Sequence, residues 1–517
     1  MDEKQENPIH KWLIAITVMT GTIMSAMDGS IVNVALPHMR ASIGASVEEI
    51  TWVATGYILS SVIIMPIVAL LSSRLGRKRL LNISVLIFTG ASMLCGLAWD
   101  LNSLVTFRII QGIGGGALIP VAMAILRETF PAEEQAKAMS IYGIGIMLGP
   151  ALAPTLGGWI TDNYSWPWIF YINVPIGIIN IFLVIRFIKD PPFLVREKGK
   201  MDFAGLLFMA FGLGAFQIML EKGNIENWFS SNFIKYLAII SCLGFLLFIW
   251  RELTTDRPAV NLRILKDINF SSGTFLGGLL GMGLMGGLFT LPLFLQQLLN
   301  YPAFNSGLAL LPRSIAMLMA MPIGGRLYNR TGPKWLIGMG LLMTCVSFYQ
   351  FSRLSLAVGY WDIFAPQALQ GIGFGLIFVS LSTAALSTIE KPLLIAATGL
   401  YSVVRQVFGS IGIAAAATLL TRGENWNRAL LVKNITVNRN VTNELLRNLS
   451  SYFYSLGIDQ TGAEQRAGKV VEGIVMRQSS MLAFNHIYFL VAVLFLISIP
   501  LVFLIKDDRL ANFKEEA

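Results

Sequence analysis

Two ionisable residues, Asp28 and Arg108, stand inside long apolar stretches of the sequence. A charged side chain at the centre of a membrane span costs about 3 kcal/mol or more, so each such residue is a functional candidate. Counted along its apolar run at a helical rise, Asp28 lies roughly 6 Å and Arg108 roughly 9 Å beyond the middle, on the same side. These similar depths allow an ion pair or a shared water between the two side chains.

A carboxylate that couples transport to protons must alternate between a charged and a neutral form. Burial disfavours the charged form of Asp28 and a nearby guanidinium favours it, so separating Asp28 from Arg108 would capture a proton and reuniting them would release it. The alternative is an Asp28 that stays ionised and only braces neighbouring helices. We expect proton coupling, because a lone carboxylate in a span is rarely kept for packing.

Two further arginines, Arg313 and Arg405, fall within about 5 Å of the middle of their apolar runs. Neither has an obvious carboxylate partner in the sequence, so each is either satisfied by backbone carbonyls or lines a substrate cavity. Three deep arginines and one deep aspartate do not require a cationic substrate. Methionine and aromatic side chains suit an adaptable cavity, although each taken singly is more often core or lipid-facing. The cavity candidates are Met24, Met27, Trp52, Tyr57, Gln111, Phe289, Phe294, Arg313, Phe378 and Arg405.

The composition excludes several classes of protein. Of the 517 residues, 55% are apolar and 13% charged, against about 25% charged in a soluble domain. The net charge of +9 comes from Lys and Arg in short segments between apolar runs, a pattern of membrane topology signals and not of a nucleic-acid-binding face. The three cysteines and three histidines show no metal-ligand spacing, so we expect no metal.

The motifs that the sequence lacks bear on the energy source and on catalysis. The sequence holds no phosphate-binding G-x-x-x-x-G-K-[ST] motif, so we expect a proton gradient and no cofactor. No paired acid–base or nucleophile constellation falls in the apolar runs, which argues against an enzyme.

The apolar runs predict an all-α membrane protein of fourteen spans, each about 20 residues long. The first, Trp12–Leu36, is too long and too polar at its centre for a cleaved signal peptide. Short loops on one side carry about 24 Lys and Arg and those on the other about four, so both termini are expected in the cytoplasm. The remaining spans are Glu48–Ser72, Leu80–Ala98, Leu104–Leu126, Ala138–Ile160, Trp168–Ile188, Phe203–Leu220, Phe233–Trp250, Phe270–Leu298, Phe304–Arg326, Trp335–Phe351, Trp361–Thr388, Ala396–Thr421 and Ala483–Ile505.

Two sequence patterns recur in the same order, which indicates two homologous halves. Arg74, Gly76 and Lys78 after the second span match Arg330, Gly332 and Lys334 after the tenth, and Gln-Gly-Ile-Gly at 111–114 recurs at 370–373. The seventh and eighth spans lie between the halves as an insertion. We therefore expect a six-helix bundle over 12–188, linkers with two added spans over 189–269, a second bundle over 270–505, and cytoplasmic ends at 1–11 and 506–517.

The ordered motifs resemble those of the major facilitator superfamily, and of its fourteen-span drug:proton antiporters in particular. The loop at 69–78 is similar to the family's signature G-x-L-a-D-r-x-G-r-k, and the segments 27–37, 108–116 and 168–177 are similar to its first-, fourth- and sixth-span motifs. Segments 217–221 and 228–231 resemble the EmrB type of exporter. The likeness implies the major facilitator fold, drug export coupled to protons, a periplasmic adaptor and an outer-membrane channel.

The resemblance also implies gating and packing roles for several residues, and a bend in the fifth span that permits exchange without leak. The acidic residue of the signature loop is replaced by Ser73, and by Asn329 in the repeat, so a gating carboxylate cannot be carried over. The residues concerned are Arg74, Gly76, Arg77, Lys78, Gly112, Gly149, Pro150, Pro154, Gly157, Gly158, Arg330 and Gly332.

A segment outside both repeats, 422–482, is too long for a simple connector. Apolar residues recur at helical spacing over 441–456 and again over 467–475, which predicts two amphipathic helices. They would lie on the outer membrane surface or dock a partner protein, and we favour docking.

The function expected from the sequence is proton-coupled export of lipophilic drugs by a transporter that lies in the lipid bilayer of a bacterial inner membrane. The nearest alternative is export of a metabolite such as a siderophore, a fatty acid or an amino acid, since a fold does not fix a substrate. A sensor that binds a partner without transport is a more remote alternative.

Overall fold

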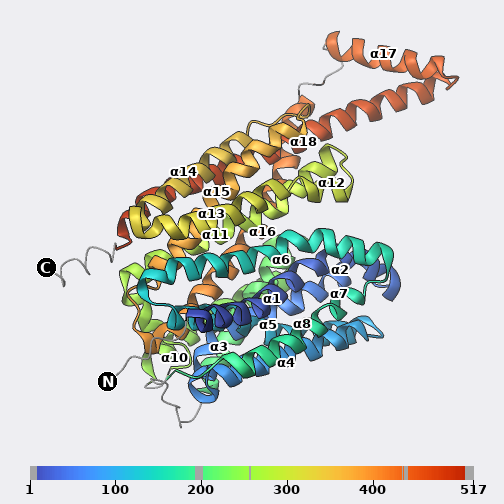
Figure 1. The fold of residues 1–517 in the computed structure, drawn as a ribbon. Helices are drawn as coiled ribbons and strands as arrows, with labels where there is room; N and C mark the ends of the chain where they lie inside the picture. The colour runs from blue at the N-terminus through green and yellow to red at the C-terminus, as the bar shows by residue number, and fades with distance from the viewer. Residues whose placement is uncertain (1–7, 192–201, 256–257, 434, 436–439, 507–517) are drawn as a thin grey trace, which may run out of the picture.

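The computed structural model describes residues 8–191, 202–255, 258–433, 435 and 440–506, and these residues form helices and connecting turns without a strand. Most of both predicted cytoplasmic ends and part of the linker after the sixth span lie outside the described residues. Two six-helix halves lie one above the other in Figure 1, with the chain running from the blue–teal half to the yellow–red half.

The first half is built from the sequence between Pro8 and Phe187. Trp168–Tyr171 and Asn173–Phe187 together form its sixth span, interrupted at Ile172. Its elements are α1 (Pro8–Ile43), α2 (Val47–Ile50), α3 (Trp52–Leu75), α4 (Arg77–Gly96), α5 (Leu101–Thr129), η1 (Ala132–Glu134), α6 (Gln135–Asn163), α7 (Trp168–Tyr171) and α8 (Asn173–Phe187).

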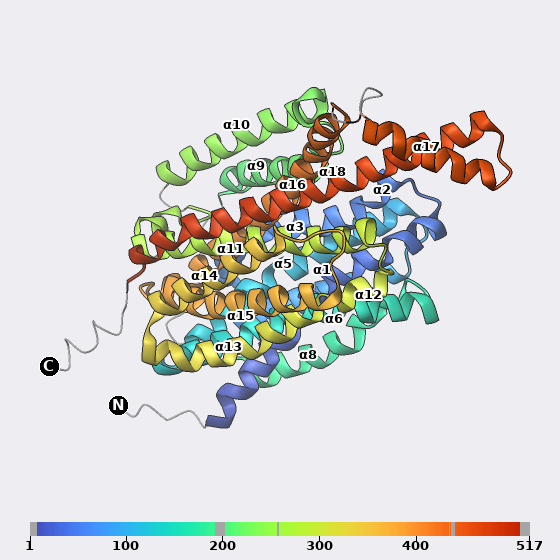
Figure 2. The same ribbon diagram turned by 90° about the horizontal axis from the view of Figure 1, so that it is seen from above.

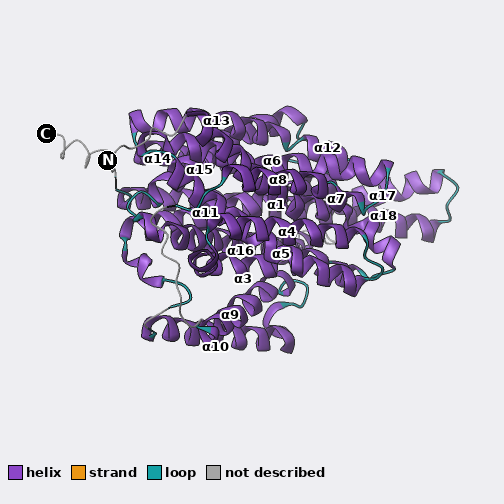
Figure 3. Cartoon of the chain, turned by 60° about the horizontal axis from the view of Figure 1, so that its bottom comes forward, coloured by secondary structure: helices purple, strands orange, loops and turns teal. Residues whose placement is uncertain are grey.

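The two inserted spans pack on each other at one side of the molecule, as Figure 3 shows. They are α9 (Phe203–Lys222) and α10 (Asn232–Thr254), with the short turns η2 (Trp228–Ser230) between them and η3 (Leu262–Lys266) after them. Of the pair, α9 contacts both halves, through α3 and α16.

The second half follows. A π-helical turn, η4 (Phe294–Leu298), prolongs its first helix. Its elements are α11 (Ile268–Leu293), α12 (Ala303–Leu308), α13 (Leu311–Thr331), α14 (Pro333–Phe351), α15 (Tyr360–Ala385), η5 (Lys391–Leu393), α16 (Leu394–Lys433), α17 (Asn440–Ser455), α18 (Gln460–Ser498) and η6 (Ile499–Leu504).

Matching helix pairs pack together in both halves, as the sequence repeat predicts. The pairs α1–α6, α3–α5 and α4–α8 of the first half correspond to α11–α16, α13–α15 and α14–α18 of the second. The signature turns match as well, since Gly76 has φ 85° and ψ 163° and Gly332 has φ 88° and ψ 161°. A side chain is strained at such a positive φ, which explains glycine at both positions.

All fourteen expected spans coincide with helices, and thirteen helical segments of the described chain are long and apolar enough to cross a membrane. The exception is α14, whose hydropathy is lowered by the polar residues Lys334, Thr344, Ser347 and Gln350. It nevertheless packs along α15 and α18 like the other spans.

The bundle has two distinct ends. We call the end at which α1 begins and η6 finishes the terminal end, and the opposite end, beyond which α17 projects, the hairpin end (Figures 1 and 2). The segment 422–482 holds more continuous helix than the sequence predicts. The second expected helix is the first part of α18, continuous with the last span, and α16 runs on to Lys433.

Contacts between the halves concentrate toward the terminal end. Ser140 donates to the carbonyl of Met321 (2.9 Å), Thr398 to that of Pro120 (3.1 Å), and the Asn329 amide to that of Glu133 (2.6 Å). These side-chain hydrogen bonds join the halves directly. The terminal end is therefore closed in this structure.

Candidate functional site

Asp28 is the centre of a buried polar cluster inside the first half. The Arg108 Nη1 group donates to Asp28 Oδ2, while the amides of Gln111 and Asn173 donate to Oδ1 at 2.9 and 3.1 Å. All four side chains are at most 1% exposed. The contact between Asp28 and Arg108 that their depths allow is thus present, and two amides complete it.

Three helices position this cluster. Arg108 and Gln111 are three residues apart on α5 and share one face of it, Asp28 lies on α1, and Asn173 is the first residue of α8. The start of α5 is fixed by Asp100, whose carboxylate accepts from the Ser103 backbone at 2.7 Å. That backbone hydrogen bond, and one with the Ser103 hydroxyl, lower the pKa of the exposed Asp100 carboxyl.

The guanidinium of Arg108 has partners on every side. Its Nε donates to the Val53 carbonyl (3.0 Å), its Nη1 also donates to Gln111 Oε1 (2.7 Å), and it lies 4.3 Å from the centre of the Tyr57 ring. Gln111 therefore bridges the pair, since it accepts from Arg108 and donates to Asp28. Together with Asn173, these donors leave neither carboxylate oxygen of Asp28 without a hydrogen bond.

The second half keeps a glutamine at the matching place but no acid. Gln370 repeats Gln111, and its partner is Arg313 of the neighbouring helix α13, at 3.5 Å. Arg313 is 3% exposed. It lines a cleft of about 40 Å³ between α6, α11 and α13, in the hairpin-end half of the bundle.

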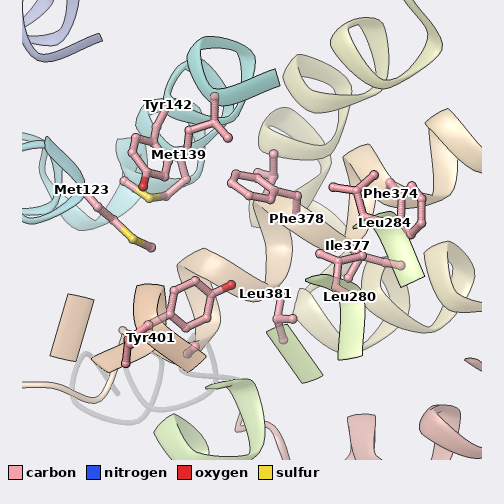
Figure 4. Close-up of a cluster of buried hydrophobic side chains, with 14 of the residues drawn as sticks. Met123, Met139, Tyr142, Leu280, Leu284, Phe374, Ile377, Phe378, Leu381 and Tyr401 are labelled. Atoms are coloured by element: carbon pink, nitrogen blue, oxygen red, sulfur yellow. The ribbon is translucent and has the colours of Figure 1, made fainter. Parts of the chain in front are cut away.

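Between the halves lies an aromatic and methionine-rich cluster, shown in Figure 4. Tyr142 of α6 stacks on Phe378 of α15 with ring centres 6.2 Å apart, and the guanidinium of Arg405 lies 5.3 Å from the Phe378 ring centre. Met123, Leu284 and Tyr401 point into the same region. Arg405 and Phe378 thus belong to the surface along which the halves meet.

The other cavity candidates lie elsewhere. Met24, Met27 and Tyr57 are buried within the first half, and Gln111 belongs to the Asp28 cluster. Trp52 lies under the ammonium of Lys222 (5.3 Å to the ring centre), Phe294 packs edge-on against Phe484, and Phe289 is partly buried on α11. Of the ten candidates, Arg313 alone lines the cleft described above.

The signature loop at the terminal end is held by buried charge. Arg77, 2% exposed, forms an ion pair with Glu128 of α5 at 2.7 Å. The backbone N–H of Lys78 donates to Asp190 at 3.0 Å. Ser73 donates only to the carbonyl of Leu70 in its own helix, whereas Asn329 reaches across to the first half. Arg74 and Arg330 lie in the last turns of α3 and α13.

The glycines of the fourth and fifth spans mark close helix contacts. A Cβ on Gly112 would lie 2.4 Å from the Tyr57 carbonyl oxygen, and one on Gly149 2.5 Å from the Met27 nitrogen. One on Gly157 would lie 2.8 Å from Ile31, and one on Gly158 would meet nothing within 4 Å. Pro150 lines the cleft beside Arg313, while the side chain of Pro154 lies outside the described residues.

Comparison with known proteins decides the family. The model of the Major Facilitator Superfamily matches residues 18–413. The chain belongs to this superfamily.

Relatives and solved structures agree with this assignment. The chain is 31% identical to the multidrug export protein EmrB of Escherichia coli K12, over 96% of this chain and 95% of that protein. It is also 31% identical to the fatty acid resistance protein FarB of Neisseria gonorrhoeae, over 95% and 96%. The fold matches the human transporter MFSD10 with a TM-score of 0.60 at 12% identity, covering 95% of this chain and 100% of that one.

These likenesses make the chain an EmrB-like, multi-pass membrane transporter of the drug-efflux type and not an enzyme. Such a major facilitator protein works in a lipid bilayer on small-molecule substrates. The described residues hold no group of His, Cys, Asp and Glu side chains that could bind a metal.

Sequence reasoning missed several residues of these sites. Asn173 lies in a motif that resembles the family's sixth-span pattern. An uncharged amide in a span costs less free energy than a charged side chain, so it does not stand out in the sequence. Glu128 and Asp190 stand near span ends, where a carboxylate is ordinary. Only the tertiary structure brings them to Asp28, Arg77 and Lys78 respectively.

Proposed function

We propose that this protein exports lipophilic drugs by exchanging them for protons, and that Asp28 carries the proton. The observation that supports this is the burial of a carboxylate on α1 whose hydrogen-bond partners come from two other helices, α5 and α8. An intramembrane acid held in this way is costly and suits a proton relay.

The exchange follows from the geometry of the cluster. With the terminal end closed, Arg108, Gln111 and Asn173 all donate to Asp28, and the guanidinium serves as its counter-ion. When α1 and α5 shift relative to each other, Asp28 loses the Arg108 donor, and a proton is the simplest replacement. Since α1 packs along α6, which lines the cleft, protonation and opening of the cleft are coupled.

The setting proposed for this exchange is the bacterial inner membrane, with both termini in the cytoplasm and the proton gradient as the only energy source. The terminal end carries Arg74, Arg77, Lys78 and Arg330, which agrees with positive charge on the cytoplasmic side. The hairpin end would then face the periplasm, where α17 would meet an adaptor protein linked to an outer-membrane channel.

A second candidate is export of a fatty acid or another amphipathic metabolite by the same machinery. The observation that favours it is the equal identity to a fatty acid resistance protein and to a multidrug export protein.

The test is transport by purified protein in liposomes with an imposed pH gradient and a panel of cationic, neutral and anionic dyes. Asp28→Asn should abolish extrusion driven by the gradient while downhill dye counterflow persists, because the variant binds substrate but cannot release a proton. Asp362→Asn, an exposed carboxylate that caps α15, is the matched control. Undiminished gradient-driven extrusion by Asp28→Asn would contradict the proposal.

A further inference from the structure

A buried arginine without a counter-ion lies beside the cleft between the halves. Arg313 is 3% exposed, and its hydrogen bond within the described chain is a long one, 3.5 Å, to the neutral side chain of Gln370. No carboxylate of the described residues forms an ion pair with it. A buried, unpaired cation is costly, so its retention calls for a partner.

The spans around Arg313 offer no such partner. The sequence of α11 has no ionisable residue, and those of α13 and α14 have no acidic one. The nearest part of α6, over 147–155, has none either. In α15 the acidic residue is Asp362, exposed in the first turn. A counter-ion for Arg313 must therefore come from outside the helices that surround it.

Comparison of the halves shows a glutamine at the matching place in both, with a cation that comes from a different helix in each. Arg313 precedes the signature glycine Gly332 by as many residues as Tyr57 precedes Gly76, so the two positions correspond on α13 and α3. In the first half the cation and the glutamine Gln111 share Asp28. In the second half Gln367 stands at the place of Arg108, the cation Arg313 comes from α13 instead, and Gln370 has no acid beside it.

Further buried polar atoms near Arg313 lack partners. Both amide atoms of Gln367, one turn before Gln370 on α15, have no hydrogen bond within the described chain, although the side chain is fully buried. The hydroxyls of Thr290 and Tyr488 have no partner other than each other. Tyr488 lies within electrostatic reach of the Arg313 charge. Such groups normally find partners, so their number beside one cation indicates a site that a ligand or water completes.

The cleft offers space beside Arg313 and largely apolar walls. Its volume of about 40 Å³ exceeds the space that one water molecule needs, and its walls include Met147, Pro150, Leu284, Leu288 and Met317. These side chains suit an apolar tail. An arginine fork in this position binds a planar or tetrahedral anion through two parallel hydrogen bonds.

We infer that Arg313, with Gln370, is the recognition site for the anionic head of an amphipathic substrate, a carboxylate or sulfonate whose apolar tail lies along the cleft. The anion supplies an acidic partner for Arg313 and Gln370, as Asp28 does for Arg108 and Gln111. This inference names a substrate class for the transport proposed above. Only its transport measurement rests on the proposed function, and the binding measurement does not.

The test uses two probes with the same tail and opposite permanent charges, decanesulfonate and decyltrimethylammonium. Binding is measured by calorimetry on the full-length protein in neutral detergent, and transport in vesicles of zwitterionic phosphatidylcholine, so that the surroundings supply no lipid or detergent with a net negative charge. Arg313→Gln should weaken decanesulfonate binding about ten- to hundred-fold, the range for a hydrogen bond to a charged group. Decyltrimethylammonium should bind as well or better, and Arg313→Lys should restore most of the anion affinity. Arg353→Gln, an exposed arginine stacked on Tyr349, is the control.

Thermal melting separates this role from a structural one. Without an anion, Arg313→Gln should melt no lower than the wild type, because it removes an unpaired buried charge, and decanesulfonate should raise the melting temperature of the wild type alone. Equal loss of both probes, an unchanged affinity for the sulfonate, or a lower melting temperature without the anion would each overturn the inference. A wild type that binds the sulfonate without proton-driven export would contradict the proposed function and leave the anion site standing.

Discussion

Asp28 and Arg313 are both buried charged residues, but they differ in what compensates the charge. Asp28 receives hydrogen bonds from a cation and two amides, so its negative charge is stabilised by the protein itself. Arg313 has a neutral partner and a cleft. A charge satisfied within the protein changes state only when helices move, whereas a charge that faces a cleft can be satisfied by a ligand. The first suits energy coupling and the second suits recognition.

Removing the Arg108 charge should change the pH dependence of transport. Arg108→Ala removes the cation beside Asp28 and leaves the carboxylate buried without an ion pair, so the pH profile of transport should move toward alkaline pH. The maximal rate should fall as well, because release of the proton becomes the difficult step. The measurement is dye transport against pH at a fixed pH gradient, with Arg108→Lys as the charge-preserving control. An unchanged profile for Arg108→Ala would show that the two residues are not coupled.

At the scale of residues, the sequence identifies buried charged side chains better than it identifies the side chains that contact them. Asp28 and Arg108 could be singled out because an ionised side chain in an apolar run is costly and its depth follows from residue counting. Asn173 could not, because a neutral amide carries little cost and its contact depends on the break at Ile172 before α8. The cavity candidates Met24, Phe294 and Trp52 fail to meet one another because the orientation of a helix about its axis is set by packing.

At the scale of elements, glycines decide how closely the helices approach. Gly112 lets α5 lie against the backbone of α3 at Tyr57, and this contact fixes the height of Arg108 and Gln111 beside Asp28. Small residues serve this purpose in membranes, where close packing and not the hydrophobic effect drives helices together.

Two glycine-to-alanine substitutions in neighbouring spans should therefore have different effects on the stability of the protein. Gly112→Ala should destabilise the protein by about 1–3 kcal/mol, since its methyl group would overlap the Tyr57 carbonyl and the Ser60 hydroxyl. Gly158→Ala should be neutral or stabilise it by up to about 1 kcal/mol, because the added methyl meets nothing and alanine favours helix. Unfolding in mixed micelles measures both. Equal effects would contradict the packing role of Gly112.

The membrane-spanning helices could be predicted from their high hydropathy, but the residues at which they end could not be predicted as well. Every expected span coincides with a helix, because a run of about 20 apolar residues has few alternatives in a bilayer. The extension of α16 to Lys433 and the fusion of the second outer helix with α18 were not predicted. Hydropathy falls where a helix leaves the membrane, so it cannot show whether the helix continues into water.

At the scale of the whole molecule, the two halves meet at the terminal end, and the cleft lies toward the other. Hydrogen bonds from Ser140, Thr398 and Asn329 close the terminal end, and Arg313 lines the cleft in the hairpin-end half. Alternating access needs these contacts to form and break in turn, while Asp28 stays within the first half. The inserted helix α9 touches both halves, so it must slide against at least one of them.

The hairpin beyond the bundle stands outside this cycle. Within the described chain, α17 packs on α18 and leaves large apolar side chains exposed, among them Val441 (77%), Tyr452 (59%) and Tyr454 (64%). An exposed apolar stripe of this kind usually marks a partner or a membrane surface. Its projection past the hairpin end, visible in Figure 2, favours a partner protein.

Deleting Val441–Leu456 should therefore separate transport from resistance. Proton-driven dye transport in liposomes should stay near the wild-type rate, because α17 contributes to neither the Asp28 cluster nor the cleft. Resistance of whole cells to lipophilic drugs should fall, because a pump uncoupled from its adaptor releases the drug into the periplasm, from which it re-enters the membrane. Replacing Val441, Tyr452 and Tyr454 with serine is a milder variant that keeps the helix and should show the same split. If transport and resistance fall together, the hairpin belongs to the transport machinery. If both stay unchanged, α17 docks nothing that resistance requires, since an apolar stripe resting on lipid would carry no drug past the periplasm.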